Sequence, residues 1–118
     1  MTSQAQEHTL TSREFFTKAE AALAQGDLLQ ASEKLWGATA HMVKAAAERR
    51  GWEHSGHREL FQVVNRLANE SGDLEFRHLF HTANSLHSNF YENWMSEDWI
   101  EAGAQQVMQL LEKLENLP

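Results

Sequence analysis

A histidine, an asparagine and a tyrosine recur at helical spacing in the segment before residue 92. Asn84 lies three residues before His87, and Tyr91 lies four residues after it, so the three side chains share one helix face. Arg77 extends this polar strip by two further turns. A histidine at the edge of a core can act as a general base when a neighbouring hydroxyl or amide group fixes its tautomer. The strip is therefore a candidate site for ligand binding or catalysis.

The competing interpretation of His87 is structural, because buried polar groups are usually paired with other protein groups. His87 can bond to Tyr91, or to a glutamate such as Glu33 on the preceding long helix, and we favour this pairing. His57, at the start of another predicted helix, is expected to approach the same place. A pair of His57 and His87 is a better candidate ligand site than either alone, whereas His41 borders the core and is expected to be structural.

Metal and cofactor sites are not expected in this chain. Two pairs of its seven histidines are spaced by three residues, His54 with His57 and His78 with His81, and two such pairs together would suit zinc. Such pairs also arise by chance in a chain with seven histidines. The chain has no cysteine, which excludes thiolate ligands and disulfides. It lacks a phosphate-binding loop and a Gly-x-Ser-x-Gly elbow, so we assign no catalytic residue and expect no enzyme of a familiar class.

Helices must position these candidate residues. Residues 1–10 show no apolar periodicity and predict a disordered tail. Thr11 and Glu14 match a capping box that starts a first helix, and Gly26 followed by Asp27 ends that helix and starts the next. The second helix carries two apolar stripes, which indicate burial against more than one neighbour. We therefore expect it to be the central helix.

Three further helices follow with the same stop and start signals. Gly72 is predicted to end the third helix and Asp73 to cap the fourth, whose core side is expected to include Trp94. No run of alternating β-branched residues and no internal repeat competes with this interpretation. The sequence therefore predicts an all-α protein, an antiparallel four- to five-helix bundle whose single domain covers residues 11–118.

The charge distribution shows no clustered positive face of the kind that binds a phosphate backbone. The net charge is −7, and residues 78–118 carry one basic and six acidic groups. A local basic group is interpreted as a solvated helix end; it comprises Lys44, Arg49, Arg50 and Arg58.

No apolar run approaches the roughly 20 residues of a membrane span, and the N-terminal residues do not match a secretory signal. We expect no membrane contact and a cytoplasmic location.

The aromatic content is large for a bundle of this size, with four tryptophans and six phenylalanines. Trp36, Trp94 and Trp99 are not expected to fit together inside one monomer, and exposed aromatic side chains mark interfaces. Gly37 inside the second helix costs about 1 kcal/mol of helix propensity, which suggests close approach of another backbone. These four residues are the interface candidates, and a symmetric homodimer is the expected assembly.

Two segments resemble the PaREP family, which is related to HEPN (higher eukaryotes and prokaryotes nucleotide-binding) domains. They are residues 26–38, with the sequence GDLLQASEKLWGA, and residues 86–92, with the sequence LHSNFYE. Ser55-Gly56-His57 before a helix is also similar to that family, and the resemblance covers roughly residues 13–117. It implies a HEPN-like bundle and a homodimer. HEPN-type proteins often act as RNA-cleaving toxins or as partners of small nucleotidyltransferases.

The chain departs from the ribonucleases of the HEPN group, which carry an arginine, four to six residues, and then a histidine. Arg77 lies too close to His81 and too far from His87. Two other pairs satisfy the count but place the histidine in or just after a loop: Arg49 with His54, and Arg50 with His57. This departure argues against ribonuclease activity, and fold analogy alone is a weak basis for assigning function.

Two functional hypotheses follow. The first is a non-catalytic homodimeric helical-bundle protein that binds a protein partner or a small ligand. The alternative is a HEPN-type, toxin–antitoxin-like protein that acts on RNA or binds a nucleotide with His87 and its neighbours, with a partner such as a small nucleotidyltransferase. The candidate ligand-binding residues for both are Glu33, His57, Arg77, Asn84, His87 and Tyr91.

Overall fold

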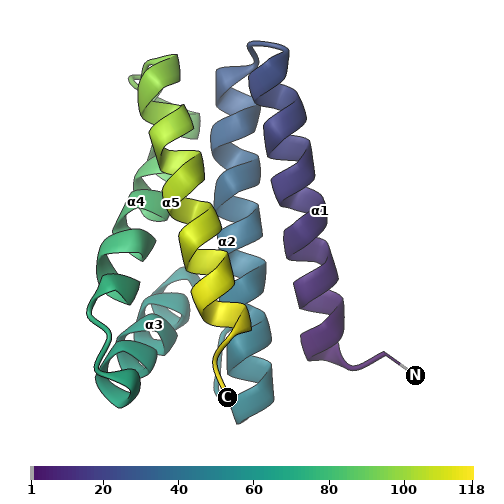
Figure 1. The fold of residues 1–118 in the computed structure, drawn as a ribbon, viewed down its shortest axis with the longest axis vertical. Coiled ribbons are helices and arrows are strands. Elements are labelled where there is room, and N and C mark those ends of the chain that lie inside the picture. The colour runs from purple at the N-terminus through teal and green to yellow at the C-terminus, as the bar shows by residue number, and fades with distance from the viewer. Residues whose placement is uncertain (1) are drawn as a thin grey trace.

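The computed structural model describes residues 2–118 of the chain. Within this range the chain forms five α-helices and no strand, arranged as Figure 1 shows. The helices are α1 (Gln4–Ala24), α2 (Leu28–Arg50), α3 (His57–Ser71), α4 (Glu75–Glu92) and α5 (Glu97–Glu115). The prediction of an all-α helical bundle is confirmed.

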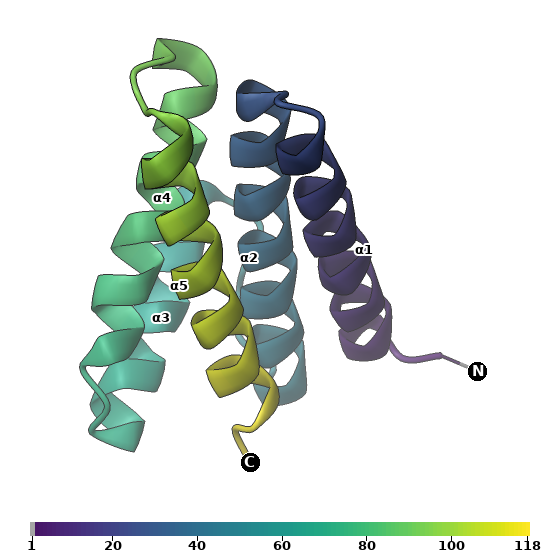
Figure 2. The same cartoon turned by 45° about the horizontal axis from the view of Figure 1, so that its top comes forward.

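Helix α2 is the centre of the bundle. It packs against α1, α4 and α5 and, over a shorter length, against α3. Figures 1 and 2 show α1 on one side of α2, with α4 and α5 on the other. The two apolar stripes of α2 are both covered, since Leu35, Met42 and Val43 are fully buried. Its predicted central place is therefore confirmed.

The junction between α1 and α2 follows the predicted chemistry. Gly26 has a φ of 76°, a left-handed conformation that a residue without Cβ adopts readily. Asp27 then accepts a hydrogen bond from the backbone N–H of Gln30 at 3.2 Å, which satisfies one of the free donors at the start of α2. The tight turn makes α1 and α2 an antiparallel hairpin.

The start of α1 differs from the prediction. Residues 4–10 are helical, and the capping box is formed by Ser3 and Gln6 instead of Thr11 and Glu14. The predicted disordered tail over residues 1–10 is wrong for residues 4–10, and Met1 lies outside the described residues. The first turn of α1 is stabilised because Ser3 and Gln6 cap free backbone N–H groups at the N-terminus of the helix.

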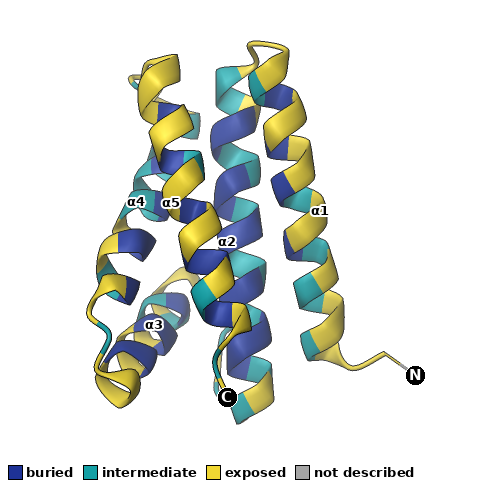
Figure 3. Cartoon of the chain, in the orientation of Figure 1, coloured by how far each residue is buried: buried dark blue, intermediate teal, exposed yellow. Residues whose placement is uncertain are grey.

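The buried faces of the helices meet in one core that α2 runs through, as Figure 3 shows. Trp36 belongs to this core, with only 7% of its surface exposed, so it cannot serve as an external contact. Gly37 faces the ring of Phe15, and a Cβ added there would lie 3.3 Å from that ring. The close approach predicted at Gly37 is therefore to a side chain of α1, and the expected approach of another backbone is wrong.

The end of α4 also differs from the prediction. Asn93 takes a left-handed conformation with a φ of 52° and ends the helix. Trp94 consequently leaves the core stripe and is 57% exposed. Asn89 occupies the buried position instead, and its side-chain oxygen accepts hydrogen bonds from the backbone N–H groups of Trp94 and Met95, each at 2.8 Å. The expected place of Trp94 in the core is wrong because the turn begins one residue before it.

Candidate functional site

Five of the six predicted ligand-binding residues gather around Trp36, on the face where α2, α3 and α4 meet. We call this group the histidine–tryptophan cluster; it comprises Glu33, Trp36, His57, Asn84, His87 and Tyr91. Helix α2 contributes Glu33 and Trp36, one turn apart. Helix α3 contributes its first residue, His57, and α4 contributes the remaining three. The spacing of three and four residues along α4 places these three on one side, as predicted.

The Trp36 indole supports both imidazole rings of the cluster. Its ring centroid lies 5.1 Å from that of His57 and 4.9 Å from that of His87, and the His87 ring is stacked on it. The two imidazole centroids are 5.6 Å apart. The predicted meeting of His57 and His87 is therefore observed in the geometry. Trp36, expected to be an interface residue, acts instead as the apolar base on which the two histidines rest.

Each histidine of the cluster has a polar partner that fixes its tautomer. His57 donates its Nε2–H to the side-chain oxygen of Asn84 at 2.9 Å. His87 donates its Nδ1–H to a carboxylate oxygen of Glu33 at 3.3 Å. In the neutral rings, the lone pair then lies on His57 Nδ1 and on His87 Nε2. The arrangement offers two imidazole nitrogens that can accept a hydrogen bond from a ligand.

Tyr91 lies at the open edge of the cluster. Its ring meets the His87 ring edge to face, with centroids 5.5 Å apart, and its side chain is 73% exposed. The contact is between rings, so Glu33, and not the Tyr91 hydroxyl, orients His87. Of the two bonding partners considered for His87, the glutamate is the one in place.

Arg77 lies apart from the cluster, although it shares the polar strip of α4. Its guanidinium donates to the side-chain oxygen of Asn65 at 2.9 Å and to that of Asn69 at 2.7 Å. Both acceptors belong to α3, which packs beside the N-terminal half of α4. The prediction that Arg77 shares a site with His87 is wrong, because Arg77 meets the later residues of α3, whereas the cluster contains the first residue of that helix, His57.

A second group of histidines lies on the opposite side of α2, and sequence patterning gave no indication of it. His8 of α1 and His41 of α2 face each other with their Nδ1 atoms 3.0 Å apart. The ring of His54, from the loop before α3, lies 5.7 Å from the ring of His8. His54 also contacts Glu48 through Nε2 at 2.7 Å. We call His8, His41 and His54 the α1–α2 histidine group.

The surroundings of His8 and His41 lower the pKa of both rings. Burial, together with His8 and Lys44, lowers the pKa of His41 from 6.5 to about 4. Burial, then His54 and Lys44, lowers the pKa of His8, while Glu48 and Glu7 act in the opposite direction. The close Nδ1 pair requires one ring to accept a hydrogen bond, so at least one of the two must be neutral. His41 is therefore structural in its geometry, as its position at the core edge indicates.

Three exposed aromatic side chains lie in or beside the turn between α4 and α5. Tyr91, Trp94 and Trp99 are 73%, 57% and 66% exposed. The expectation that Trp36, Trp94 and Trp99 do not all fit inside one monomer agrees with this geometry. We call Tyr91, Trp94 and Trp99 the aromatic turn. It adjoins the histidine–tryptophan cluster, because Tyr91 belongs to both.

Residues 2–118 show neither a group of metal ligands nor a helix suited to a membrane. Within that range, no group of three or more histidine, aspartate and glutamate side chains is arranged to hold a metal ion. His78 and His81 are both exposed on α4. None of the five described helices has both the length and the apolarity needed to cross a membrane.

Comparison with known proteins places the chain in a family. The sequence profile of the archaeal PaREP1/PaREP8 family matches residues 7–111. A crystal structure of a protein from Sulfolobus solfataricus has a similar fold, with a TM-score of 0.76 and 22% sequence identity over 90% of this chain and 94% of that chain. No curated protein matches the chain in sequence. From the profile match over most of its length, the chain is a member of the archaeal PaREP1/PaREP8 family.

Proposed function

We propose that this chain is a non-catalytic, homodimeric helical-bundle protein of the cytoplasm that binds a small ligand or a protein partner at the histidine–tryptophan cluster. Two copies meet at the aromatic turn. The observation that carries the proposal is the exposure of three large aromatic side chains within nine residues, at 57% or more of their surface. Large aromatic side chains that are exposed close together in sequence often mark an interface.

A second copy of the chain is the occupant that the aromatic turn suits best. Tyrosine and tryptophan are enriched at the centres of protein interfaces, and twofold pairs are the commonest closed assemblies. The turn is held in one shape from inside. Buried Asn89 accepts from two backbone N–H groups of the turn and donates to the Ser32 hydroxyl at 2.9 Å. A rigid aromatic surface loses little conformational entropy on association.

The cluster beside this interface has the features of a binding site. Two imidazole rings with fixed tautomers lie over an indole, and each retains one ring nitrogen for a ligand. Among residues 2–118, no lysine or arginine forms a hydrogen bond or ion pair with a cluster residue. The cluster therefore suits a ligand that donates hydrogen bonds to the two imidazole rings.

Molar mass in solution tests the dimer. We expect the wild type to show twice the 13.5 kDa of one chain in light scattering at micromolar concentration. The double variant Trp94→Ser/Trp99→Ser is expected to be monomeric, because it removes two interface aromatics. Leu74→Ser is the matched control, since Leu74 is 58% exposed at the other end of α4 and its loss should leave the dimer intact.

Circular dichroism of the double variant separates loss of association from loss of folding.

Because Glu92, Glu97 and Asp98 flank the aromatic turn in each copy, raising the salt concentration should strengthen the dimer by screening their repulsion. A wild type that remains monomeric at micromolar concentration contradicts the proposal.

A second candidate function is action on RNA or binding of a nucleotide, with a small nucleotidyltransferase as a partner. The observation that favours it is the Glu33–His87 contact, with the ring centroids of His57 and His87 5.6 Å apart. A histidine oriented by a carboxylate can act as a general base through its other ring nitrogen. RNA cleavage and nucleotide binding by the wild type and by His87→Ala test it, with exposed His78→Ala on the same helix as the control. If the wild type is inert, or His87→Ala matches it, this function is excluded.

A further inference from the structure

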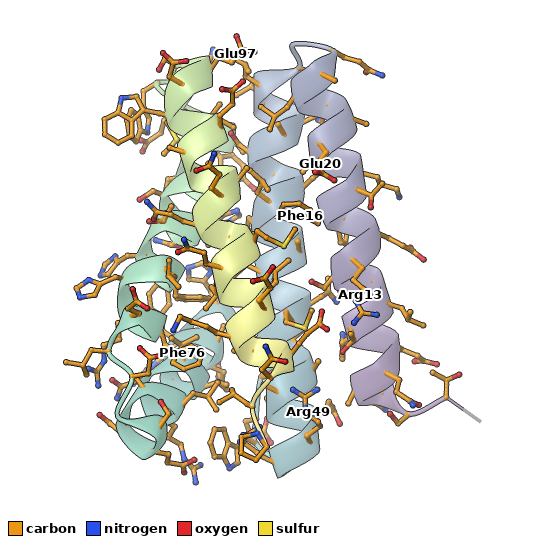
Figure 4. All side chains as sticks on the ribbon, in the orientation of Figure 1. Arg13, Phe16, Glu20, Arg49, Phe76 and Glu97 are labelled. Atoms are coloured by element: carbon orange, nitrogen blue, oxygen red, sulfur yellow. The ribbon has the colours of Figure 1, made fainter. Side chains whose placement is uncertain are left out.

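A groove runs between α1 and α5, away from both histidine groups. Two cavities of about 360 and about 530 Å³ lie along it. They share the lining residues Phe16, Glu20 and Met108, so they form one continuous groove. Figure 4 shows Phe16 and Glu20 in successive turns of α1 on the side toward α5.

The groove exists because α1 is attached to the bundle mainly through α2. Helix α1 packs along α2, and it has no comparable packing against α5. Arg13 and Glu115 connect α1 and α5 at one end, with Arg13 Nε donating to Glu115 at 3.2 Å. This ion pair closes the end of the groove and leaves its length open.

The surfaces inside the groove are apolar. Phe16 and Leu111 form its base, with 8% and 4% of their surface exposed. Leu23 and Ala104 are half-buried along the walls, and Met108 is 37% exposed. Methionine adapts its shape to different partners and is common at surfaces that bind helices.

The rim of the groove is acidic. Its lining carries one guanidinium, Arg13, and four carboxylates: Glu20, Glu101, Glu112 and Glu115. Arg13 is paired with Glu115, which leaves three carboxylates without that compensation. A second copy of the chain placed symmetrically on this face would bring the same carboxylates together. The charge therefore disfavours self-association here and complements a basic partner.

The length of the groove matches a helix. Its lining along α5 and the residue that caps this helix runs from Glu101 to Asn116, which at 1.5 Å per residue corresponds to roughly 22 Å, or about four helical turns. We propose that the groove binds an amphipathic helix of a partner protein, whose apolar stripe is flanked by lysine or arginine residues. The apolar stripe would contact Phe16 and Met108, and its basic flanks would pair with the rim carboxylates.

A designed peptide tests this inference. The probe is a fluorescent helical peptide of about four turns with leucine at positions i, i+3, i+4 and i+7 and lysine elsewhere, compared with a scrambled peptide of the same composition. We expect the patterned peptide to bind at least about tenfold more tightly than the scrambled one, and to bind less tightly as the salt concentration rises. Equal binding of the two peptides overturns the proposal.

Charge variants locate the binding to the groove. Glu20→Lys/Glu101→Lys should weaken binding by about tenfold or more. Glu53→Lys/Glu70→Lys changes the net charge equally at exposed positions outside the groove, and should change binding by less than about twofold. If both double variants weaken binding equally, the peptide senses net charge only and the proposal is wrong.

A variant that places a charge in the groove tests whether a second copy of this chain, instead of a partner helix, occupies it. Met108→Asp is expected to fold, because Met108 is partly exposed, and to abolish peptide binding while leaving the molar mass of the protein unchanged. If Met108→Asp instead converts a dimer to a monomer, the groove is a contact between copies of this chain and the proposal is overturned. The aromatic turn is tested separately by Trp94 and Trp99, so the two proposals can fail independently.

Discussion

The two histidine groups lie on opposite sides of α2 and differ in what their rings contact. In the α1–α2 histidine group, His8 and His41 are each other's hydrogen-bond partners, 3.0 Å apart between two packed helices. In the histidine–tryptophan cluster, His57 and His87 each bond to a different polar side chain and lie against Trp36, with the His87 ring stacked and the His57 ring tilted. Each of these four rings makes one hydrogen bond, so the two groups differ in the partner of that bond and in the aromatic surface beside the rings.

The comparison shows that a cluster of titratable side chains is not by itself a functional site. The lowered pKa of His41 reflects its burial between α1 and α2, and it describes a packing contact. The histidine–tryptophan cluster is the better candidate because Tyr91 joins it to the exposed aromatic turn. Three substitutions test this contrast, and they follow in order of decreasing expected effect on stability.

The largest effect is expected for the buried amide beneath the aromatic turn. Asn89→Ala removes the acceptor of two backbone N–H groups and the donor to Ser32. Leaving buried polar groups unpaired, together with the cavity, should cost about 2–4 kcal/mol of unfolding free energy. Urea denaturation measures this loss, and the dimer should weaken with it because the turn loses its internal support.

Asn84→Ala is the control for Asn89→Ala. Asn84 bonds only to His57 at an exposed position, so its replacement should cost about 1 kcal/mol or less. Equal unfolding free energies for the two asparagine variants would show that the hydrogen bonds of Asn89 do not stabilise the aromatic turn.

The next largest effect is expected when acid lowers the stability of the protein through His41. His41 has an ordinary pKa of 6.5 and a folded pKa of about 4, so between these values the unfolded chain binds a proton that the folded chain does not. The unfolding free energy contributed by His41 is present in full above pH 6.5 and is lost as the pH falls toward 4. After allowance for partial solvent screening, this loss should be about 1–2 kcal/mol.

Denaturation at several pH values compares the two histidine groups directly. His41→Gln should reduce the loss of stability between pH 6.5 and pH 4, because glutamine has no proton to bind in that range. His87→Gln is the matched control in the other group and should leave most of that loss in place. A pH dependence that persists in His41→Gln and disappears in His87→Gln would reverse the roles assigned to the two groups.

The smallest effect on stability is expected for His87→Ala. The Glu33–His87 contact is partly exposed on both sides, and ion pairs of this kind contribute about 1 kcal/mol or less. We therefore expect a small change in urea denaturation, accompanied by loss of any ligand binding at the cluster. A loss of stability as large as that of Asn89→Ala would support the purely structural interpretation of His87.

Much of the fold follows from local patterns in the sequence. Gly26 and Gly51 mark helix ends because they adopt left-handed conformations with φ of 76° and 71°, and the apolar spacing in α2 matches its buried residues. The start of α1 was missed because the capping box at Ser3 and Gln6 precedes a segment with little apolar periodicity. His8 and Thr9 are partly buried there, against a neighbour that no local pattern identifies.

The sequence predicted most residues of the candidate site, but it predicted few of the contacts between them. Helical spacing alone places Asn84, His87 and Tyr91 on one face, and the same rule wrongly added Arg77. Whether a guanidinium two turns away joins a site depends on which part of the neighbouring helix it meets, and here Arg77 meets Asn65 and Asn69, farther along α3 than His57. Trp36 beneath the histidines, and the pairing of His8 with His41, depend likewise on contacts between helices distant in sequence.

The most direct test of the proposed dimer measures where two copies approach each other. The chain has no cysteine, so a spin label can be attached to a single introduced cysteine. Glu92→Cys lies beside the aromatic turn, and Glu70→Cys lies near the end of α3; both positions are exposed. Pulsed electron spin resonance should give a defined intermolecular distance for Glu92→Cys that is shorter than that for Glu70→Cys. A shorter distance at Glu70→Cys, or no intermolecular coupling at either position, would contradict dimerisation through the aromatic turn.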